Sequence, residues 1–286
     1  MARENGVSVM LAGDGGDEIF GGNSRYVEEL ILNLYQFVPG LLRHRVLEPM
    51  LLNAAGLDKW APGRKARNYV RRARIPMPDR TQRHNFYYGA DLAGIIDPEL
   101  LRGIDAEEPL VGLREVYERT GSSAILQRMM HLDLKLTLAD NDLRKVGVAC
   151  ALAEMPVAFP FLDDDVVEFA ASVPPDLLIR RLEKRWFYKQ AVSDFLPAAT
   201  LQKRKHGFGM PFSEWPRENP ELREMALDCL AGLRRRHYLS QDFLDRLGRD
   251  DGGPEADGLI WDLMVLELWL RDRETRAPRG QSQTFR

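Results

Sequence analysis

The chain has 286 residues, 44% of them hydrophobic, and its 43 acidic and 40 basic side chains give a net charge of −3. This size and hydrophobic content predict a globular protein of one or two domains with a core of its own. The nearly balanced charge excludes a global positive field that would recruit nucleic acid. No apolar run reaches the roughly 18–20 residues needed to cross a bilayer, and Met1–Gly6 lacks the apolar core of a signal peptide, so we expect no membrane partner.

The two cysteines, Cys150 and Cys229, are far apart in the sequence and lie in mostly apolar surroundings. This favours buried thiols over a disulfide or a metal site. Free thiols are typical of a reducing compartment, so we expect a cytoplasmic protein.

The first predicted element is a short buried strand, Val7–Leu11, which is apolar and β-branched and ends at a glycine-rich corner. Gly13, Gly15 and Gly16 let the backbone take positive φ and let a ligand approach closely. Glycines on both sides of a group of acids indicate that room is left for something other than a simple turn.

The acids of this corner are Asp14, Asp17 and Glu18, at the start of a predicted helix. Two interpretations remain open. Asp is a favoured N-cap and acids suit the positive end of a helix dipole, so the acids can be simple helix caps. They can also hold Mg²⁺ with phosphate, because Mg²⁺ is typically bound by one or two carboxylates plus phosphate oxygens.

The next part of the chain is predicted to be largely helical. Apolar spacing and Pro or Gly breaks give helices at Tyr26–Phe37, Leu41–Ala55, Pro98–Leu101 and Leu110–Tyr117. The stretch Lys59–Arg83 is rich in Arg, Lys and Pro, and we expect a mobile, solvated loop or a poorly packed connection there, with a phosphate-binding patch as the alternative.

A long amphipathic helix is predicted for Ser122–Asp140, with a polar end at Asp140–Lys145. The three acids Asp163–Asp165 follow a Pro-containing loop and predict a helix cap with solvated charge. The C-terminal segment Leu259–Leu270 is apolar over most of its circumference, which predicts a buried core helix.

Between these helices, Lys203, Arg204, Lys205 and His206 run directly into Gly207-Phe208-Gly209. A solvated basic loop is the default interpretation of such a stretch. Combined with the acidic corner it suggests a second one: a metal and phosphate site facing a lysine that neutralises charge on a phosphoryl transition state.

Five motifs occur in one order across nearly the whole chain: GDGGDEIFGG, DNDLRKV, PFLDDDVVEFA, KRKHGFGMP and LIWDLMVLELWL. In this order they resemble the synthetase domain of glutamine-dependent asparagine synthetases. The resemblance implies a mainly α chain, the C-terminal part of an α/β ATP-pyrophosphatase (adenine nucleotide alpha hydrolase-like) domain with one or few strands at the N-terminus. Residues 1–286 would form one asparagine synthetase-like domain, with 1–30 ending the nucleotide fold and 31–286 forming a helical region.

The family adenylates aspartate with ATP and Mg²⁺, and ammonia from glutamine then displaces AMP to give asparagine. Carried onto the family motif S-G-E-G-x-D-E, the resemblance implies that Asp14 helps deprotonate or orient the ammonia and that Asp17 binds Mg²⁺. Lys205 matches the lysine of the family's K-x-G-F loop and would stabilise the charge that develops as pyrophosphate leaves.

The remaining implied site residues would contact ATP: Gly13, Gly15, Gly16 and Lys145. Two departures bear on the acceptor. The family reads K-V-D-R after the long helix, where this chain has Gly147 and Val148 after Lys145-Val146, and it reads Glu-Val-Arg where this chain has Pro156-Val157-Ala158. Relatives in polysaccharide and exosortase loci, and the β-lactam synthetases, share the scaffold, so an acceptor carboxylate other than aspartate stays open.

The family's Ser-Gly-Gly-x-Asp-Ser pyrophosphate loop and its glutaminase domain have no counterpart in this sequence. We therefore expect a C-terminal part that pairs with a missing N-terminal half or a glutaminase domain, with a homodimer also possible. We also expect the chain alone to bind Mg·ATP weakly. The alternative class is a non-catalytic remnant that only binds a partner.

Overall fold

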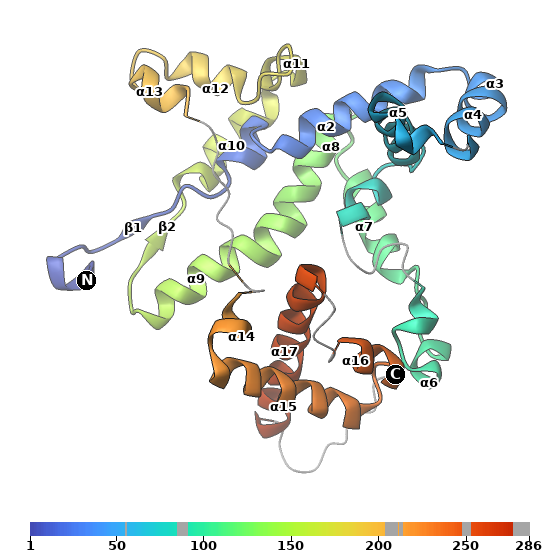
Figure 1. Ribbon diagram of the computed structural model, residues 1–286. Coiled ribbons are helices and arrows are strands. Elements are labelled where there is room, and N and C mark those ends of the chain that lie inside the picture. The colour runs from blue at the N-terminus through green and yellow to red at the C-terminus, as the bar shows by residue number, and fades with distance from the viewer. Residues whose placement is uncertain (55, 85–90, 204–210, 212–213, 248–252, 277–286) are drawn as a thin grey trace. The chain divides into compact units, whose positions relative to one another are not determined.

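The computed structural model describes residues 1–54, 56–84, 91–203, 211, 214–247 and 253–276, most of them helical (Figure 1). This confirms the mainly α expectation. The chain divides into two compact units, Met1–Asn85 with Glu107–Arg204 and Phe86–Ala106 with Lys205–Arg286. No described helix combines the length and hydropathy that crossing a bilayer requires.

The first unit contains two strands, α-helices, and short 3₁₀ or π segments labelled η. In chain order they are η1 Arg3–Asn5, β1 Met10–Leu11, α1 Gly16–Phe20, α2 Ser24–Asn33, η2 Leu34–Phe37, α3 Gly40–Leu42, η3 Arg43–Leu47, α4 Glu48–Asn53, η4 Leu57–Lys59, α5 Ala61–Ala73, η5 Asp79–His84, α7 Glu108–Glu118, α8 Ile125–Leu132, η7 Asp133–Asp142, α9 Leu143–Leu152, β2 Val157–Ala158, η8 Pro160–Leu162, α10 Asp164–Ser172, α11 Pro175–Leu178, α12 Trp186–Ala191 and α13 Ala198–Leu201. The second unit contains η6 Leu92–Gly94, α6 Pro98–Arg102, α14 Trp215–Glu218, α15 Pro220–Arg236, α16 Gln241–Leu247 and α17 Gly253–Arg276.

Strands β1 and β2 form a two-stranded parallel sheet, with Met10 opposite Val157 and Leu11 opposite Ala158 (Figure 1). The strand is shorter than the predicted Val7–Leu11, and the expectation that it is buried is wrong, since Leu11 is 70% exposed. Parallel strands are normally covered on both faces. No described element covers β1 in this way, and this explains its exposed apolar side chains.

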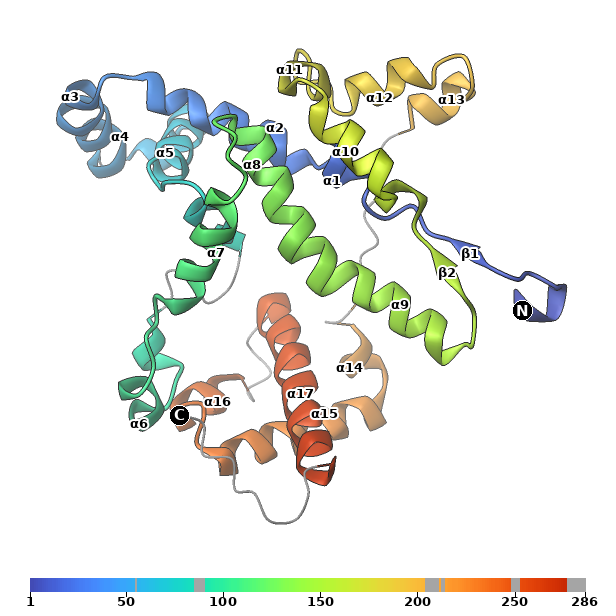
Figure 2. The same cartoon turned by 180° about the vertical axis from the view of Figure 1, so that it is seen from behind.

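Helices α8, η7 and α9 run on as one long helix, seen from both sides in Figures 1 and 2. The predicted polar end at Asp140–Lys145 therefore lies inside this helix. Its charges pair along the helix surface, with Lys145 Nζ 3.0 Å from Asp142 Oδ1 and Arg144 Nη2 3.7 Å from Asp140 Oδ1. Pairs at this spacing support a helix, so a polar stretch alone does not end one.

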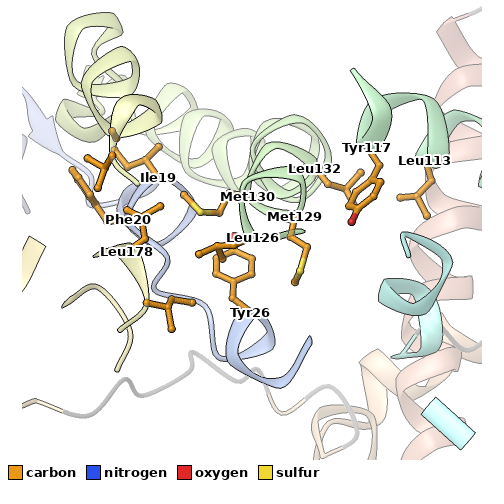
Figure 3. Close-up of a cluster of buried hydrophobic side chains, with 13 residues drawn as sticks. Ile19, Phe20, Tyr26, Leu113, Tyr117, Leu126, Met129, Met130, Leu132 and Leu178 are labelled. Atoms are coloured by element: carbon orange, nitrogen blue, oxygen red, sulfur yellow. The ribbon is translucent and has the colours of Figure 1, made fainter. Parts of the chain in front are cut away.

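The main core of the first unit lies where α1 and α2 meet α8 (Figure 3). Ile19 and Phe20 of α1 and Tyr26 of α2 pack with Leu126 and Met130 of α8, all at most 6% exposed. Each fully buried side chain of this size contributes about 1.5–3 kcal/mol. The residues just after the acidic corner thus anchor it to the long helix.

The expected solvated loop at Lys59–Arg83 is wrong for most of its length, because α5 forms there. Val70 and Ala73 are buried against Leu32 and Tyr35, at the spacing of one helix face. The Arg67 side chain is also buried, and its Nε donates a 2.8 Å hydrogen bond to the Leu51 carbonyl oxygen. Carbonyl partners of this kind let a basic helix face lie inside a fold.

A buried ion pair ties α2 to η5. Arg80 Nε lies 2.5 Å from Glu29 Oε2, and the two side chains are only 1% and 3% exposed. Arg80 Nη1 also donates a 3.2 Å hydrogen bond to the Ala73 carbonyl oxygen. The pair therefore fixes α2, the end of α5 and η5 against one another.

The second unit is held by α15 packed on α17, around the buried residues Cys229, Leu233, Leu263 and Met264. The prediction that Leu259–Leu270, apolar over most of its circumference, is a buried core helix is correct for only one face, because Trp269 is 48% exposed.

A second buried ionic group sits in this interface. Glu267 is 2% exposed and accepts hydrogen bonds from Arg236 Nε at 2.6 Å and Arg271 Nε at 2.8 Å. Burial alone would raise the pKa of Glu267, but the two arginines outweigh it and hold the pKa below its ordinary value.

Both cysteines are free, as expected. Cys229 is buried, but the expectation of a buried thiol is wrong for Cys150, which is partly exposed. Burial raises the pKa of the Cys229 thiol. A buried thiol of this kind acts as a small apolar side chain in the core.

Replacing Arg80 with methionine leaves the buried Glu29 carboxylate without its arginine. We expect the free energy of unfolding to fall by about 3–5 kcal/mol, the usual cost of breaking a buried ion pair from one side. Urea denaturation followed by far-UV circular dichroism measures this loss.

Two variants control this experiment. Arg144→Ala removes an exposed pair and should leave stability unchanged within error. The double variant Glu29→Leu/Arg80→Met should recover much of the loss, because apolar replacement of both partners is often neutral. A loss in Arg80→Met no larger than that in Arg144→Ala would contradict the assignment of this pair.

Candidate active site

The acidic corner is a tight turn between β1 and α1, and Gly15 makes it possible. Gly15 has a φ of +92°, and a Cβ there would collide with the Leu162 side chain. Only glycine meets both conditions without strain. The turn at Asp14-Gly15 is therefore built for close packing against the Pro160–Leu162 segment.

Aromatic packing extends the same contact. A Cβ on Gly16 would lie 3.2 Å from the Phe161 ring, and the Phe20 and Phe161 rings meet edge to face with centroids 6.4 Å apart. The GDGGDEIFGG and PFLDDD motifs, distant in sequence, are thus brought together. Sequence reasoning listed them separately, and the structure makes them one corner.

The Asp17 carboxylate is held from two sides. Arg185 Nη1 lies 3.3 Å from Asp17 Oδ1, with the arginine side chain 32% and the aspartate side chain 19% exposed. A Cβ on Gly22 would collide with the same carboxylate, so the chain passes directly against it. Asp17 therefore faces a positive charge in a confined space.

Arg185 is a site residue that sequence reasoning missed. It is one of four basic residues in the stretch RRLEKR, and no local pattern separates it from its neighbours. Its backbone is left-handed, with φ +55°, and it is the N-cap residue just before α12. Its Nε is buried without a hydrogen-bond partner among the described residues. The αL turn of a non-glycine residue is the signal that only a structure supplies.

Asp14 lies in the turn itself and is partly buried. Within the part of the chain that the structure describes, its carboxylate makes no hydrogen bond or ion pair. Asp14 and Asp17 are three residues apart, on the turn and the first turn of α1. The corner thus offers one carboxylate engaged by arginine and one without a described partner.

The other predicted residues stand as follows. Gly13 has open space around it, since a Cβ there meets no atom within 4 Å. Lys145 is exposed on α9 and pairs with Asp142, and no described contact joins it to the corner. Lys205 lies outside the described residues, and the nearby Lys203 is exposed after α13.

The helix cap predicted at Asp163 is present. Asp163 Oδ1 accepts a 3.1 Å hydrogen bond from the Asp165 backbone N–H at the start of α10. For this acid the capping interpretation is confirmed.

For Asp14 and Asp17 capping is not seen. The N-cap position of α1 is Gly15, which makes no side-chain cap. Asp17 lies in the first turn of α1, where an acid also suits the helix dipole.

The donor set fits one Mg²⁺ bound together with phosphate. The described ranges hold no group of three His, Cys, Asp or Glu side chains that could bind a metal alone. Mg²⁺ needs only one or two carboxylates when substrate phosphates supply the other oxygens. Asp14 and Asp17 supply carboxylate oxygens of this kind, and Arg185 already pairs with Asp17 on one side.

An ion pair between α2 and η7 lies next to the corner. Arg25 Nη2 lies 3.0 Å from Asp133 Oδ1, and Thr137 Oγ1 donates a 3.2 Å hydrogen bond to the same oxygen. Burial, and next the Asp133 carboxylate, raise the pKa of Tyr26 well above its ordinary value. Tyr26 thus stays neutral in the core beside the corner.

Comparison with known proteins decides the family. The family model for asparagine synthase matches residues 1–271. The chain belongs to this family. The glutamine-hydrolyzing asparagine synthetase 1 of Bacillus subtilis (strain 168) is 24% identical over 270 residues, which cover 92% of this chain and 40% of that relative. A putative glutamine-hydrolyzing asparagine synthetase of Mycobacterium bovis is 25% identical over 276 residues, covering 92% and 39%.

The chain thus spans about 40% of the length of the curated relatives it matches. No solved structure matches it. The family is established by sequence, and the specific nucleotide-binding fold remains a prediction.

The corner geometry predicts unequal roles for its glycines. Gly15→Ala combines a strained φ with a collision against Leu162, so we expect the free energy of unfolding to fall by about 1–3 kcal/mol. Gly13→Ala meets open space and should change it by less than about 0.5 kcal/mol. Urea denaturation of the two variants side by side measures the difference, and equal losses would refute this packing of the corner.

Proposed function

We propose that this chain carries part of the synthetase site of a glutamine-dependent asparagine synthetase. The family match over residues 1–271 supports this, and so do the names of the relatives. The single structural observation that carries it is the corner itself, in which Asp17 is packed against Gly22 and faces Arg185. Sequence corresponding to the rest of these relatives would supply the glutaminase reaction, in the same polypeptide or in a partner.

In the proposed reaction, a carboxylate oxygen of aspartate attacks the α-phosphorus of ATP. A bond from the α-phosphorus to the acceptor oxygen forms, the bond to the bridging oxygen breaks, and pyrophosphate leaves. Ammonia then attacks the activated carbonyl carbon, AMP leaves with the acyl oxygen, and the amide nitrogen loses its extra proton. The products are asparagine, AMP and pyrophosphate.

The residues of this chain have separate duties in that scheme. Asp14, whose carboxylate has no described partner, accepts a proton from the ammonia or orients it. Lys205 holds positive charge at the leaving pyrophosphate. Gly13, Gly15, Gly16 and Lys145 would lie along ATP.

Asp17 would hold Mg²⁺, together with phosphate oxygens of the nucleotide. When bound, the ion offsets the charge of the phosphates and so lowers the barrier to their departure. Arg185 keeps the Asp17 carboxylate oriented by their ion pair.

The test uses the protein in its complete natural form, with any partner chain that co-purifies, and measures release of pyrophosphate from ATP in the presence of aspartate. Asp17→Asn keeps the shape of the side chain and removes a metal ligand, so we expect release to become undetectable.

Asp165→Asn, a change to an exposed acid in the first turn of α10, is the matched control and should leave release unchanged. Undiminished release in Asp17→Asn would return Asp17 to a structural role.

The lysine assignment has its own matched pair. Lys205→Ala should lower the rate of pyrophosphate release by about a hundredfold, the loss expected for a positioned group on developing charge. Lys203→Ala, two residues away, should stay within a few-fold of the parent. Equal effects would make the segment an electrostatic surface only. Lys205→Arg keeps the charge on a larger planar head and should rescue only in part.

A second candidate is amidation of a carboxylate other than aspartate. The observation that favours it is the replacement of two charged pairs of the family, at Gly147-Val148 and at Pro156–Ala158. In the structure Val148 is 58% exposed on α9, and Val157 and Ala158 form β2. Pyrophosphate release from ATP that depends on an added carboxylate other than aspartate, and does not respond to aspartate, would select this candidate. No release with any acceptor, from a folded protein, would favour a non-catalytic partner-binding role.

A further inference from the structure

The first unit contains a cavity of about 650 Å³ between α1, the long helix and α10. This volume lies within the range of small-molecule pockets. None of the residues assigned above to amidation lines it, so an inference from this cavity does not depend on the proposed function.

One end of the cavity is polar and positively charged. Arg119 and Lys135 line it together with His131. Ser122 and Gln127 lie in the same part, where Ser122 Oγ donates a 2.6 Å hydrogen bond to Gln127 Oε1. The loop before α8 is therefore ordered by its own hydrogen bonds and presents its basic neighbours to the cavity.

The positive charges at this end have little opposing charge. Arg119 Nη2 lies 3.8 Å from Glu115 in an exposed pair, which is a weak interaction. Lys135 makes no ion pair within the described part of the chain. Glu118 of α7 is engaged with Arg128, and Glu18, the one acid that lines the cavity, has an interaction of its own.

The pKa of His131 lies below its ordinary value. Burial lowers its pKa, and Lys135 and Arg119 lower it further. The imidazole, the ammonium and the guanidinium thus lie close enough to repel one another. An anion among them would relieve that repulsion.

The other end of the cavity is apolar. The same long helix continues from His131 and Lys135 to Leu138 and Leu143, and Val167 of α10 lines the cavity with them. Met130 and Leu134 of this helix also line the cavity beside His131 and Lys135, and beyond Lys135 the helix contributes no further charged residue to the lining. A nucleotide or sugar would leave its polar body without partners at the apolar end.

We propose that this cavity binds an amphipathic carboxylic acid, with its carboxylate at Arg119, His131 and Lys135 and its apolar chain along Leu138, Leu143 and Val167. The charged head gains charge-assisted hydrogen bonds, and the chain buries apolar area. The basic residues alone would bind any anion, and the apolar residues alone would bind any apolar molecule. Together they favour a ligand that has a carboxylate and an apolar chain.

The experiment titrates the whole protein by calorimetry with dodecanoate, held below the concentration at which it forms micelles. Dodecan-1-ol and dodecylammonium, with the same chain and a neutral or positive head, are the matched ligands. We expect one saturable dodecanoate site, about tenfold weaker binding of the alcohol, and no binding of the cation. Equal binding of the three ligands, many molecules per chain, or no dodecanoate binding would overturn the proposal.

Variants locate the site. Lys135 is exposed, so Lys135→Ala should fold normally and weaken dodecanoate binding about tenfold while leaving the alcohol unaffected. Arg144→Ala, a change to an exposed side chain of the same long helix that does not line the cavity, should have no effect. Ala139→Trp fills the apolar end and should abolish binding of both ligands, with thermal melting to confirm that the variant is folded.

An independent measurement is NMR titration of His131. Bound dodecanoate should raise the pKa of this imidazole, because the carboxylate offsets Lys135 and Arg119. An unchanged pKa at saturating dodecanoate would place the head group elsewhere and overturn the proposal.

Discussion

The parallel pairing of β1 with β2 is the constraint on which the candidate active site depends. Hydrogen bonds from Met10 N to the Pro156 carbonyl oxygen, 2.8 Å, and from Ala12 N to the Ala158 carbonyl oxygen, 2.9 Å, fix the two strands in register. A shift by one residue would turn each side chain to the opposite face. This register brings the glycine turn after β1 against the Pro160–Leu162 segment after β2, and so makes one corner out of two distant motifs.

Local signals in the sequence were sufficient for much of the fold. The Asp163 cap, the helix at Leu110–Tyr117 and most of the long helix follow from capping chemistry and from apolar spacing, both of which act within a few residues. The failures are nonlocal. Helix α5 is basic and looked solvated, yet Arg67 finds carbonyl oxygens of another segment. The apolar sequence of Val7–Leu11 predicts a buried strand, but a strand is buried only when other elements cover its faces. The residues of the strand itself do not show whether such elements are present.

The same division holds for the candidate site. The glycines and acids of the corner could be selected from the sequence, because they are close neighbours in the chain. Glycines allow a close approach of the backbone, and several carboxylates lie side by side. Arg185 could not, because its role comes from an αL turn that directs it to Asp17. The cavity could not either, since its lining comes from segments that are far apart in the sequence, among them α1, the end of α7, the long helix and α10.

Helix α1 connects these features, and its length decides how. Five residues are too few to be stable alone in water, because one or two hydrogen-bonded turns do not offset the cost of nucleation. Its position must therefore come from packing: Ile19 and Phe20 in the core, and Gly21 with φ +70° at its end. Asp17 lies on this same helix, between the turn at Gly15 and the core residues. The packing of Ile19 and Phe20 in the core thus fixes the geometry of the acidic corner. A substitution that loosens either side chain would displace the Asp17 carboxylate, although Asp17 itself is unchanged.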